Sequence, residues 1–179
     1  MTVKLDVMRS EYTGLAWAFR VNPASCGNSD HYEEYIKFIA LEDYRAGMGT
    51  THVLLEYAGE NTNDPPVKML AYITLKATSV TEVCDGVKSG KPALEITELA
   101  VSEDCALKGY GSVLVQYAIV TAKNLNQEFL GVKYVVLCAD QMAVPFYEKL
   151  HFAPLRNSFD IPREGWNRDC TPMLLEIET

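Results

Sequence analysis

The feature that most constrains the fold of this chain is a glycine-containing loop between a strand pattern and a helix pattern. The segment LEITELAVSEDCALKGYGSVLV at 94–115 predicts a strand, a short loop with Gly109, Tyr110 and Gly111, and a helix that begins at once. The first N–H groups of a helix have no intrahelical partner, and the helix dipole adds positive charge there. Glycine lets a backbone approach a ligand closely. The pattern therefore predicts a main-chain cradle for a phosphate or pyrophosphate.

The other segments predict an α/β fold. Apolar spacing favours a helix over 31–47, with Asp30 as its N-cap and Gly47 as its end. Strand and helix cannot be separated at 14–19, and residues 78–92 are expected to form a loop. The remaining expected elements are strands at 3–9, 51–58, 67–76, 93–101, 132–138 and 172–178, and helices at 112–124 and 142–150. A strand–helix–strand order implies a right-handed parallel crossover, so the sheet should be mixed, with helices on both faces.

Length and composition favour a single domain over residues 1–179. No apolar run reaches the roughly 18 residues of a membrane-spanning helix. The N-terminus carries charges where a signal peptide needs an apolar stretch, so we expect a cytoplasmic protein without membrane contact. The net charge of −8 disfavours broad binding to a phosphate backbone. It is compatible with a cationic substrate, or with solubility alone.

Cysteine and histidine spacing gives no metal pattern. The five cysteines are widely spaced without a CxxC pair, which argues against a disulfide framework and against zinc. Cys138 is expected in the core as a free thiol. The three histidines (His31, His52 and His151) are expected to be structural or superficial, and no metal is expected.

The glycine loop can be compared with those of three phosphate-binding folds. A P-loop needs Gly-Lys-Ser/Thr after four intervening residues, which the chain lacks. A dinucleotide fold needs a third glycine where this chain has Leu114. The third interpretation, a site for the pyrophosphate of an acyl-CoA, agrees with the downstream half of the chain.

The segments LAVSEDCALKGYGSVLVQYAI and VKYVVLCADQMAVPFYEKLHF resemble the core of the GNAT acetyltransferase superfamily. The resemblance covers roughly residues 50–178 in element order, with its sharpest motifs in 95–152. Ala106–Gly111 resembles the family pattern Gln/Arg-x-x-Gly-x-Gly/Ala, with Ala106 where a long polar side chain is usual. The element at 145–152 resembles "FYEKLGF", with His151 in place of the glycine, and His tolerates a left-handed conformation better than most residues.

The resemblance implies a single GNAT domain of the α/β (α+β) class. Its sheet would be mostly antiparallel with a splayed parallel centre. Residues 1–50 would be variable and 93–152 would hold the cofactor. The cosubstrate would be acetyl-CoA and the reaction would be transfer of an acetyl group to an amine.

The resemblance also implies roles for individual residues. Main-chain groups of Leu99, Ala100 and Val101 would hold the pantetheine arm. Tyr147 would be the general acid at the thioester sulfur. Either Glu95 or Glu98 would be the base, since residues three apart on a strand face opposite sides, and a water relay is a third possibility. The pyrophosphate would meet N–H groups of Lys108, Gly109, Tyr110, Gly111 and Ser112, and Lys108 would replace the positive charge missing at Ala106.

The sequence says little about which amine accepts the acetyl group. A primary amine of a small molecule or peptide is the first interpretation, with the loops 22–30, 59–66 and 78–92 around its pocket. The stretch SCGNSDHYEEYIKFIA resembles the toxin branch of the superfamily, whose members acetylate aminoacyl-tRNA and pair with an antitoxin. The charge of −8 opposes that alternative, so nucleic acid is not expected as a partner. An inactive CoA-binding module is the third possibility, and a homodimer is plausible.

Overall fold

A computed structural model describes residues 1–179 except 25–26, 61, 156–158, 161–168 and 179. The chain forms two compact units, the first from Met1–Leu75 and Glu98–Val115 and the second from Lys76–Thr97 and Gln116–Thr179. The long elements β3, β4 and α4 contribute residues to both units. Cys26 lies outside the described residues.

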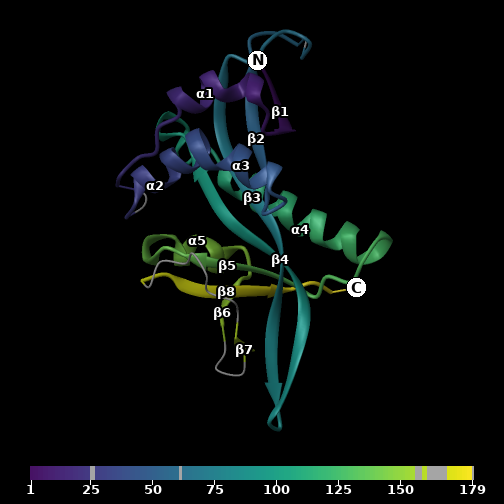
Figure 1. The fold of residues 1–179 in the computed structure, drawn as a ribbon. Coiled ribbons are helices and arrows are strands. Elements are labelled where there is room, and N and C mark those ends of the chain that lie inside the picture. The colour runs from purple at the N-terminus through teal and green to yellow at the C-terminus, as the bar shows by residue number, and fades with distance from the viewer. Residues whose placement is uncertain (25–26, 61, 156–158, 161–168, 179) are drawn as a thin grey trace. The chain divides into compact units, whose positions relative to one another are not determined.

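The strands of the first unit form an antiparallel ladder. β1 (Thr2–Val7) pairs with β2 (Thr50–Tyr57), and β2 pairs with the first part of β3 (Lys68–Cys84). The helices here are α1 (Thr13–Ala18), α2 (Ser29–Glu34) and α3 (Ala40–Arg45), with a π-helical turn at Tyr35–Ile39 between the last two (Figure 1). The segment 14–19 is therefore largely helical.

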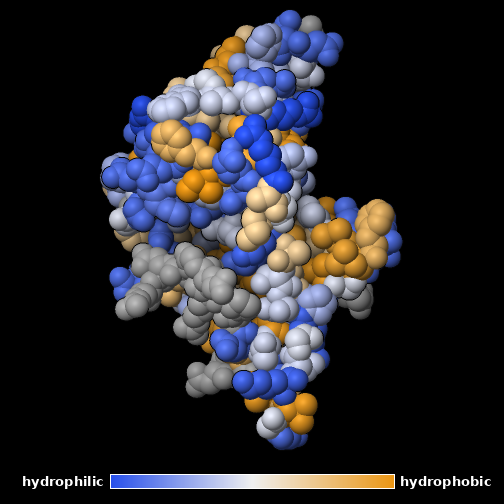
Figure 2. All heavy atoms as spheres, viewed as in Figure 1, coloured by the Kyte–Doolittle hydropathy of each residue, from blue (hydrophilic) through white to orange (hydrophobic). Residues whose placement is uncertain are grey.

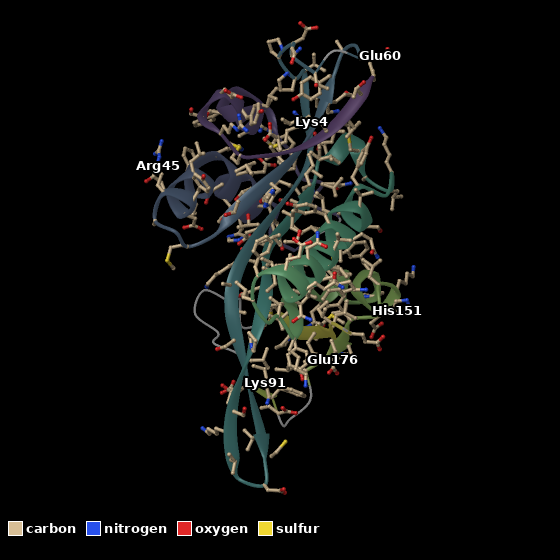
Figure 3. The ribbon with its side chains drawn as sticks, turned by 90° about the vertical axis from the view of Figure 1, so that its right-hand side faces the viewer. Lys4, Arg45, Glu60, Lys91, His151 and Glu176 are labelled. Carbon is tan, nitrogen blue, oxygen red and sulfur yellow. A yellow bond between two sulfur atoms is a disulfide. The ribbon has the colours of Figure 1, made fainter. Side chains whose placement is uncertain are left out.

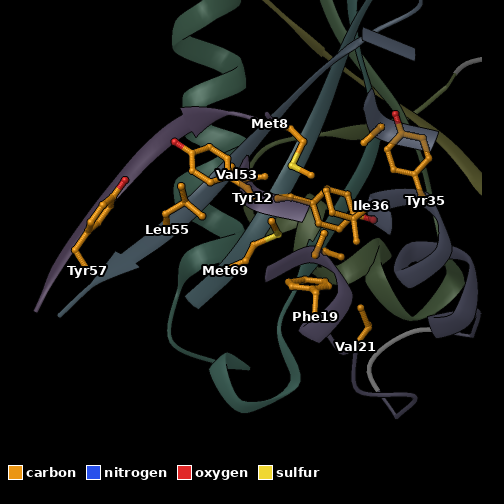
Figure 4. Close-up of a cluster of buried hydrophobic side chains, with 14 residues drawn as sticks. Met8, Tyr12, Phe19, Val21, Tyr35, Ile36, Val53, Leu55, Tyr57 and Met69 are labelled. Carbon is orange, nitrogen blue, oxygen red and sulfur yellow. The ribbon is translucent and has the colours of Figure 1, made fainter. Parts of the chain in front are cut away.

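The core of the first unit shows why these elements fold together. Tyr12, Phe19, Ile36 and Tyr72 belong to one buried cluster drawn from the helices and from β2, β3 and β4 (Figure 4). The Tyr72 hydroxyl donates a 2.7 Å hydrogen bond to the carbonyl of Tyr32, which satisfies its polar end inside the core. The N-terminal helices thus cover one face of this sheet.

The second unit holds the parallel pair. Ala93–Ile96 of β4 (Val87–Val101) pairs in parallel with Tyr134–Leu137 of β5 (Tyr134–Ala139). Antiparallel neighbours extend this ladder: β5 pairs with β8 (Thr171–Glu176), and β8 pairs with β6 (Ala153–Pro154). The remaining elements are α4 (Tyr110–Glu128), α5 (Val144–Lys149) and β7 (Phe159–Asp160), which pairs with β3. The mixed, mostly antiparallel sheet predicted from the sequence is confirmed.

Two local expectations are wrong. Residues 78–92 do not form a loop, because β3 and β4 run on into a hairpin closed at Asp85-Gly86. Both turn residues have positive φ, 51° and 80°, which an Asp-Gly pair tolerates and which suits a two-residue hairpin turn. The helix expected from Asp30 begins instead at Ser29, with Asn28 before it and no side-chain cap.

Apolar side chains are exposed at several places on the surface. Figure 2 shows hydrophobic residues over the C-terminal end of α4, where Phe129 and Leu130 follow the helix and are exposed. No helix in the described part of the chain is long and apolar enough to cross a membrane.

Candidate functional site

The loop that precedes α4 is held in a special backbone conformation. A 3-10 turn at Glu103–Cys105 leads into Leu107, with a φ of 62°, and Gly109, with a φ of 84°. A Cβ added at Gly109 would meet nothing within 4 Å, so the backbone conformation rather than crowding is what favours glycine here. The glycine loop predicted from the sequence thus turns directly into a helix.

The start of α4 presents main-chain donors. The Val113 N–H donates to the Gly109 carbonyl at 3.1 Å, so the preceding amides of Tyr110, Gly111 and Ser112 come before the first intrahelical bond. The Lys108 amide is 3.4 Å from the Cys105 carbonyl, so it is already weakly engaged in the loop. The Lys108 side chain is exposed, which leaves its ammonium at the surface beside the loop. These groups form a main-chain donor site suited to an anion, in which the Lys108 amide is less available than the sequence suggests.

Hydrogen bonds to the rest of the first unit anchor this loop. The amide of Ser102 donates to the Leu70 carbonyl at 2.9 Å, and the amide of Glu103 donates to the Arg20 carbonyl at 2.8 Å. The Asp104 carboxylate pairs with the Lys68 ammonium and accepts a 2.8 Å hydrogen bond from the Ser102 hydroxyl. These contacts, the one to Lys68 foremost, lower the pKa of Asp104 to about 2. The Asp104 carboxylate is therefore engaged with Lys68, and Glu103 and Asp104 are both exposed.

The strand before the loop carries the residues predicted for the pantetheine arm. The parallel ladder of β4 covers Ala93–Ile96, and Leu99–Val101 lie beyond that stretch. Ala100 is buried in the core of the first unit, whereas Leu99 and Val101 are half-buried. Ala100 thus marks the face of this strand that is turned to the N-terminal helices.

The two candidate bases on β4 have different surroundings. Glu95 is 3% exposed, lies within the parallel ladder and stands opposite Val136 in the register. Glu98 lies in the first unit and pairs with His31 of α2, with 3.0 Å between Glu98 Oε1 and His31 Nε2. The Glu98 side chain is 13% exposed and that of His31 is 45% exposed. Of the two glutamates, Glu98 therefore belongs to the polar pair that solvent reaches.

Tyr147 is 7% exposed and lies in the last turn of α5. Its ring contacts those of Phe146 and Phe152, with centroids 4.9 and 5.8 Å away. The Tyr147 carbonyl accepts from the Phe152 amide at 3.1 Å, and the Glu148 carbonyl accepts from the His151 amide at 3.0 Å, the two bonds of a Schellman motif. His151 has a φ of 69°, which confirms its left-handed position at the end of α5 (Figure 3).

The cysteine prediction is wrong for two residues. Cys138 on β5 and Cys170 form a disulfide, so Cys138 is neither a free thiol nor a simple core residue. The antiparallel register explains the pairing, because Pro172 of β8 lies opposite Cys138 and Cys170 precedes it by two residues. Widely spaced cysteines carry no sign of such a contact in the sequence. No group of three or more His, Cys, Asp or Glu placed to hold a metal ion occurs in the described ranges.

His31 is the residue that sequence reasoning missed. We expected it to be structural or superficial, because no spacing linked it to another functional residue. Its partner Glu98 is 67 positions away, and only the packing of α2 over the end of β4 brings the two together. The helix pattern over 31–47 placed His31 on a helix but could not say what that helix covers.

Comparison with known proteins gives the family. The family model described as the acetyltransferase (GNAT) family matches residues 15–152, which is more than half of the chain. No protein of curated function matches the sequence.

Solved structures with similar folds include three toxin structures. The first is a tyrosine mutant of the toxin AtaT bound to acetyl-CoA and the C-terminus of the antitoxin AtaR, with 15% identity and a TM-score of 0.70, covering 98% of this chain and 93% of that one. The second is AtaT complexed with acetyl-methionyl-tRNAfMet, with 15% identity, a TM-score of 0.73 and coverages of 98% and 95%. The third is described as a bacterial toxin, with 20% identity, a TM-score of 0.73 and coverages of 98% and 91%.

At these identities the likeness establishes the fold, and the family match establishes the class of enzyme. The glycine loop, the start of α4 behind it and the element around Tyr147 all lie within the residues that the family model matches. The chain therefore belongs to the GNAT family of acetyltransferases and uses acetyl-CoA as its acetyl donor.

Proposed function

We propose that this enzyme is a toxin-type acetyltransferase whose acceptor is the α-amino group of an aminoacyl-tRNA. The observation that carries the proposal is the fold likeness over 98% of the chain to AtaT, a toxin whose structure with acetyl-methionyl-tRNAfMet is among the matches. This choice reverses the order of our sequence interpretations, in which a small-molecule or peptide amine came first and nucleic acid was not expected.

Main-chain groups of the first unit would hold the cosubstrate. The amides of Gly109, Tyr110, Gly111 and Ser112 offer donors and a positive helix end to the pyrophosphate, and the Lys108 ammonium adds charge. Main-chain groups of Leu99, Ala100 and Val101 would bind the pantetheine arm as a strand is bound. When bound, acetyl-CoA supplies an activated acyl group with a thiolate as its leaving group.

Two proton transfers are then required of the protein. The acceptor is an ammonium at neutral pH, so a base must remove a proton before the nitrogen can attack the thioester carbon. The leaving thiolate is stabilised by a proton donor, the role we assign to Tyr147. Glu98 is the better placed of the two glutamates for the first step, because Glu95 is 3% exposed within the parallel ladder.

A small-molecule or peptide amine remains the second candidate acceptor. The net charge of −8 favours it, because binding of tRNA gains from a basic surface. An antitoxin-like protein partner belongs to the first candidate only. The single-domain organisation over 1–179, the homodimer and the cytoplasmic address stay predictions.

The test is a transfer assay with labelled acetyl-CoA. Purified protein is offered a pool of aminoacyl-tRNAs, the same tRNAs without amino acid, and a panel of polyamines and peptides. Label on aminoacyl-tRNA alone, lost at high salt, supports the proposal. Label on small amines alone would instead support the second candidate acceptor, a small-molecule or peptide amine. Stabilisation by acetyl-CoA without transfer to any acceptor would indicate an inactive CoA-binding module.

A further inference from the structure

A side-chain hydrogen bond links α2 to the end of β4 in the first unit. His31 Nε2 and Glu98 Oε1 are 3.0 Å apart, and the residues are separated by 67 positions in the sequence. Glu98 immediately precedes Leu99–Val101, the stretch proposed to hold the pantetheine arm. The imidazole is 45% exposed while the carboxylate is 13% exposed, so the pair has a sheltered anionic end and an accessible basic end.

We propose that the His31 imidazole accepts the proton of the attacking amine and that Glu98 is a positioning residue that orients the ring. This inference rests on the proposed acetyltransferase reaction, and it assigns the first proton transfer to a residue outside the family motifs of the chain. It also changes the role of Glu98 from base to partner of the base.

The hydrogen bond defines the proton path. A carboxylate only accepts hydrogen bonds, so in the neutral ring Nε2 carries the proton shared with Glu98 and Nδ1 carries the lone pair. The acceptor ammonium transfers one proton to Nδ1, and the resulting imidazolium is stabilised by the adjacent carboxylate. The nitrogen then forms the C–N bond, the C–S bond breaks, and the thiolate is protonated as the amide nitrogen loses its second proton. The net reaction releases one proton, which an exposed imidazole can pass to water.

The chemistry of histidine favours one class of acceptor. An ordinary imidazole has a pKa of about 6.5, an α-amino group about 7.7–8.0 and a lysine-like amine about 10.4. Between groups with these ordinary values, proton transfer to an imidazole is uphill by little more than about one pKa unit from an α-amino group, but by about four from an alkyl amine. A histidine base thus matches the α-amino group of an aminoacyl ester better than it matches a polyamine or a lysine side chain.

The described groups that surround the ring are carboxylates and phenols. From β4 the ring meets Glu98, and within α2 its neighbours are Asp30, Tyr32, Glu33 and Glu34. The Tyr32 ring lies 5.3 Å from that of His31, and Tyr72 of β3 reaches the Tyr32 carbonyl. Carboxyl groups ordinarily titrate near pH 4 and phenols near pH 10, so an acidic limb that is present in the wild type and lost in a His31 variant is assigned to this ring.

The first test is His31→Gln, whose amide can still donate to Glu98 but cannot accept a proton from an amine. We expect kcat/KM for the acceptor to fall by about 10²-fold or more at pH 7, and the acidic limb of its pH profile to disappear. Stabilisation by acetyl-CoA and the thermal midpoint of the free protein should stay unchanged. His151→Asn is the matched control, because it removes another exposed imidazole and Asn tolerates the left-handed position.

Chemical rescue separates a proton acceptor from a structural histidine. His31→Ala should recover part of its rate when free imidazole is added, and the recovery should follow the concentration of the neutral form. Glu98→Gln should keep the acidic limb and lose a smaller factor of about ten, since the ring keeps a hydrogen-bond partner.

Two outcomes separate failure of this inference from failure of the proposed function. Full activity and an unchanged pH profile in His31→Gln would overturn the inference while leaving the enzyme assignment intact. A wild-type protein that acetylates no acceptor would instead remove the proposed function itself.

Discussion

The two regions to which we assign proton transfers are built in opposite ways. Tyr147 belongs to a local structure, in which the helix end, the ring contacts and the backbone hydrogen bonds all come from residues 146–152. The His31–Glu98 pair joins residues 67 positions apart and exists only because α2 packs over the end of β4. The first region is buried and aromatic, whereas the second is polar and partly exposed.

The two kinds of site therefore differ in how easily they are recognised from the sequence. A local structure is recognisable from a short sequence motif, and PFYEKLHF therefore identifies both Tyr147 and the left-handed position of His151. A pair of residues that are distant in the sequence has no such motif, and neither His31 nor Glu98 identifies the other.

The largest expected effect concerns the local region. Tyr147→Phe removes one hydroxyl and keeps the buried ring packed against Phe146 and Phe152. We expect turnover to fall by about 10²-fold or more while acetyl-CoA binding is nearly unchanged, because the hydroxyl acts on the leaving thiolate. Steady-state kinetics together with a thermal-shift titration would measure both. A variant with full turnover removes Tyr147 from the mechanism.

The next effect separates the two glutamates of β4. Glu98→Gln should lower kcat/KM by about ten-fold, whereas Glu95→Gln should change it by less than about three-fold. The reason is that Glu98 meets His31, whereas Glu95 lies at 3% exposure opposite Val136 in the second unit. Equal losses of kcat/KM in the two variants, measured at matched folded fractions, would contradict a special role for Glu98.

A smaller effect tests how local the Tyr147 region is. His151→Gly replaces a residue with a φ of 69° by one that adopts this conformation without strain. We expect a gain of up to about 1 kcal/mol in the free energy of unfolding, since the left-handed conformation costs an L-residue roughly 1–2 kcal/mol and glycine loses part of that in entropy. Urea unfolding would measure it. A clear loss of stability would mean that the His151 side chain itself contributes contacts.

The smallest effect measures how much stability comes from a long-range ion pair that has no assigned role in proton transfer. Lys68 and Asp104 are 36 positions apart and exposed, so Asp104→Asn should lower the free energy of unfolding by less than about 1 kcal/mol at pH 7. The pKa of Asp104 is lowered to about 2, so its contribution is present above pH 4 and lost as the pH falls toward 2.

The free energies of unfolding of the wild-type protein and of the Asp104→Asn variant should therefore converge between pH 4 and pH 2 in acid-unfolding curves. A difference that persists unchanged at pH 2 contradicts the assignment of the effect to this carboxylate.

Much of the fold was predictable, for local reasons. The glycine loop before α4 and the end of the helix near Gly47 depend on residues close in sequence, and the structure confirms both, with a φ of 84° at Gly109 and 69° at Gly47. The hairpin at 78–92 was missed because its polar and glycine residues are typical of loops, whereas the turn that closes it needs only Asp85 and Gly86.

The family, the acetyl donor and the position of the glycine loop were predictable from the sequence alone, because they depend on short motifs whose backbone preferences act over a few residues. The disulfide between Cys138 and Cys170 and the contact between His31 and Glu98 were visible only in the folded protein. Both contacts follow from strand register and helix packing. Those arise from the burial of many apolar side chains at once, so no single residue or spacing carries them.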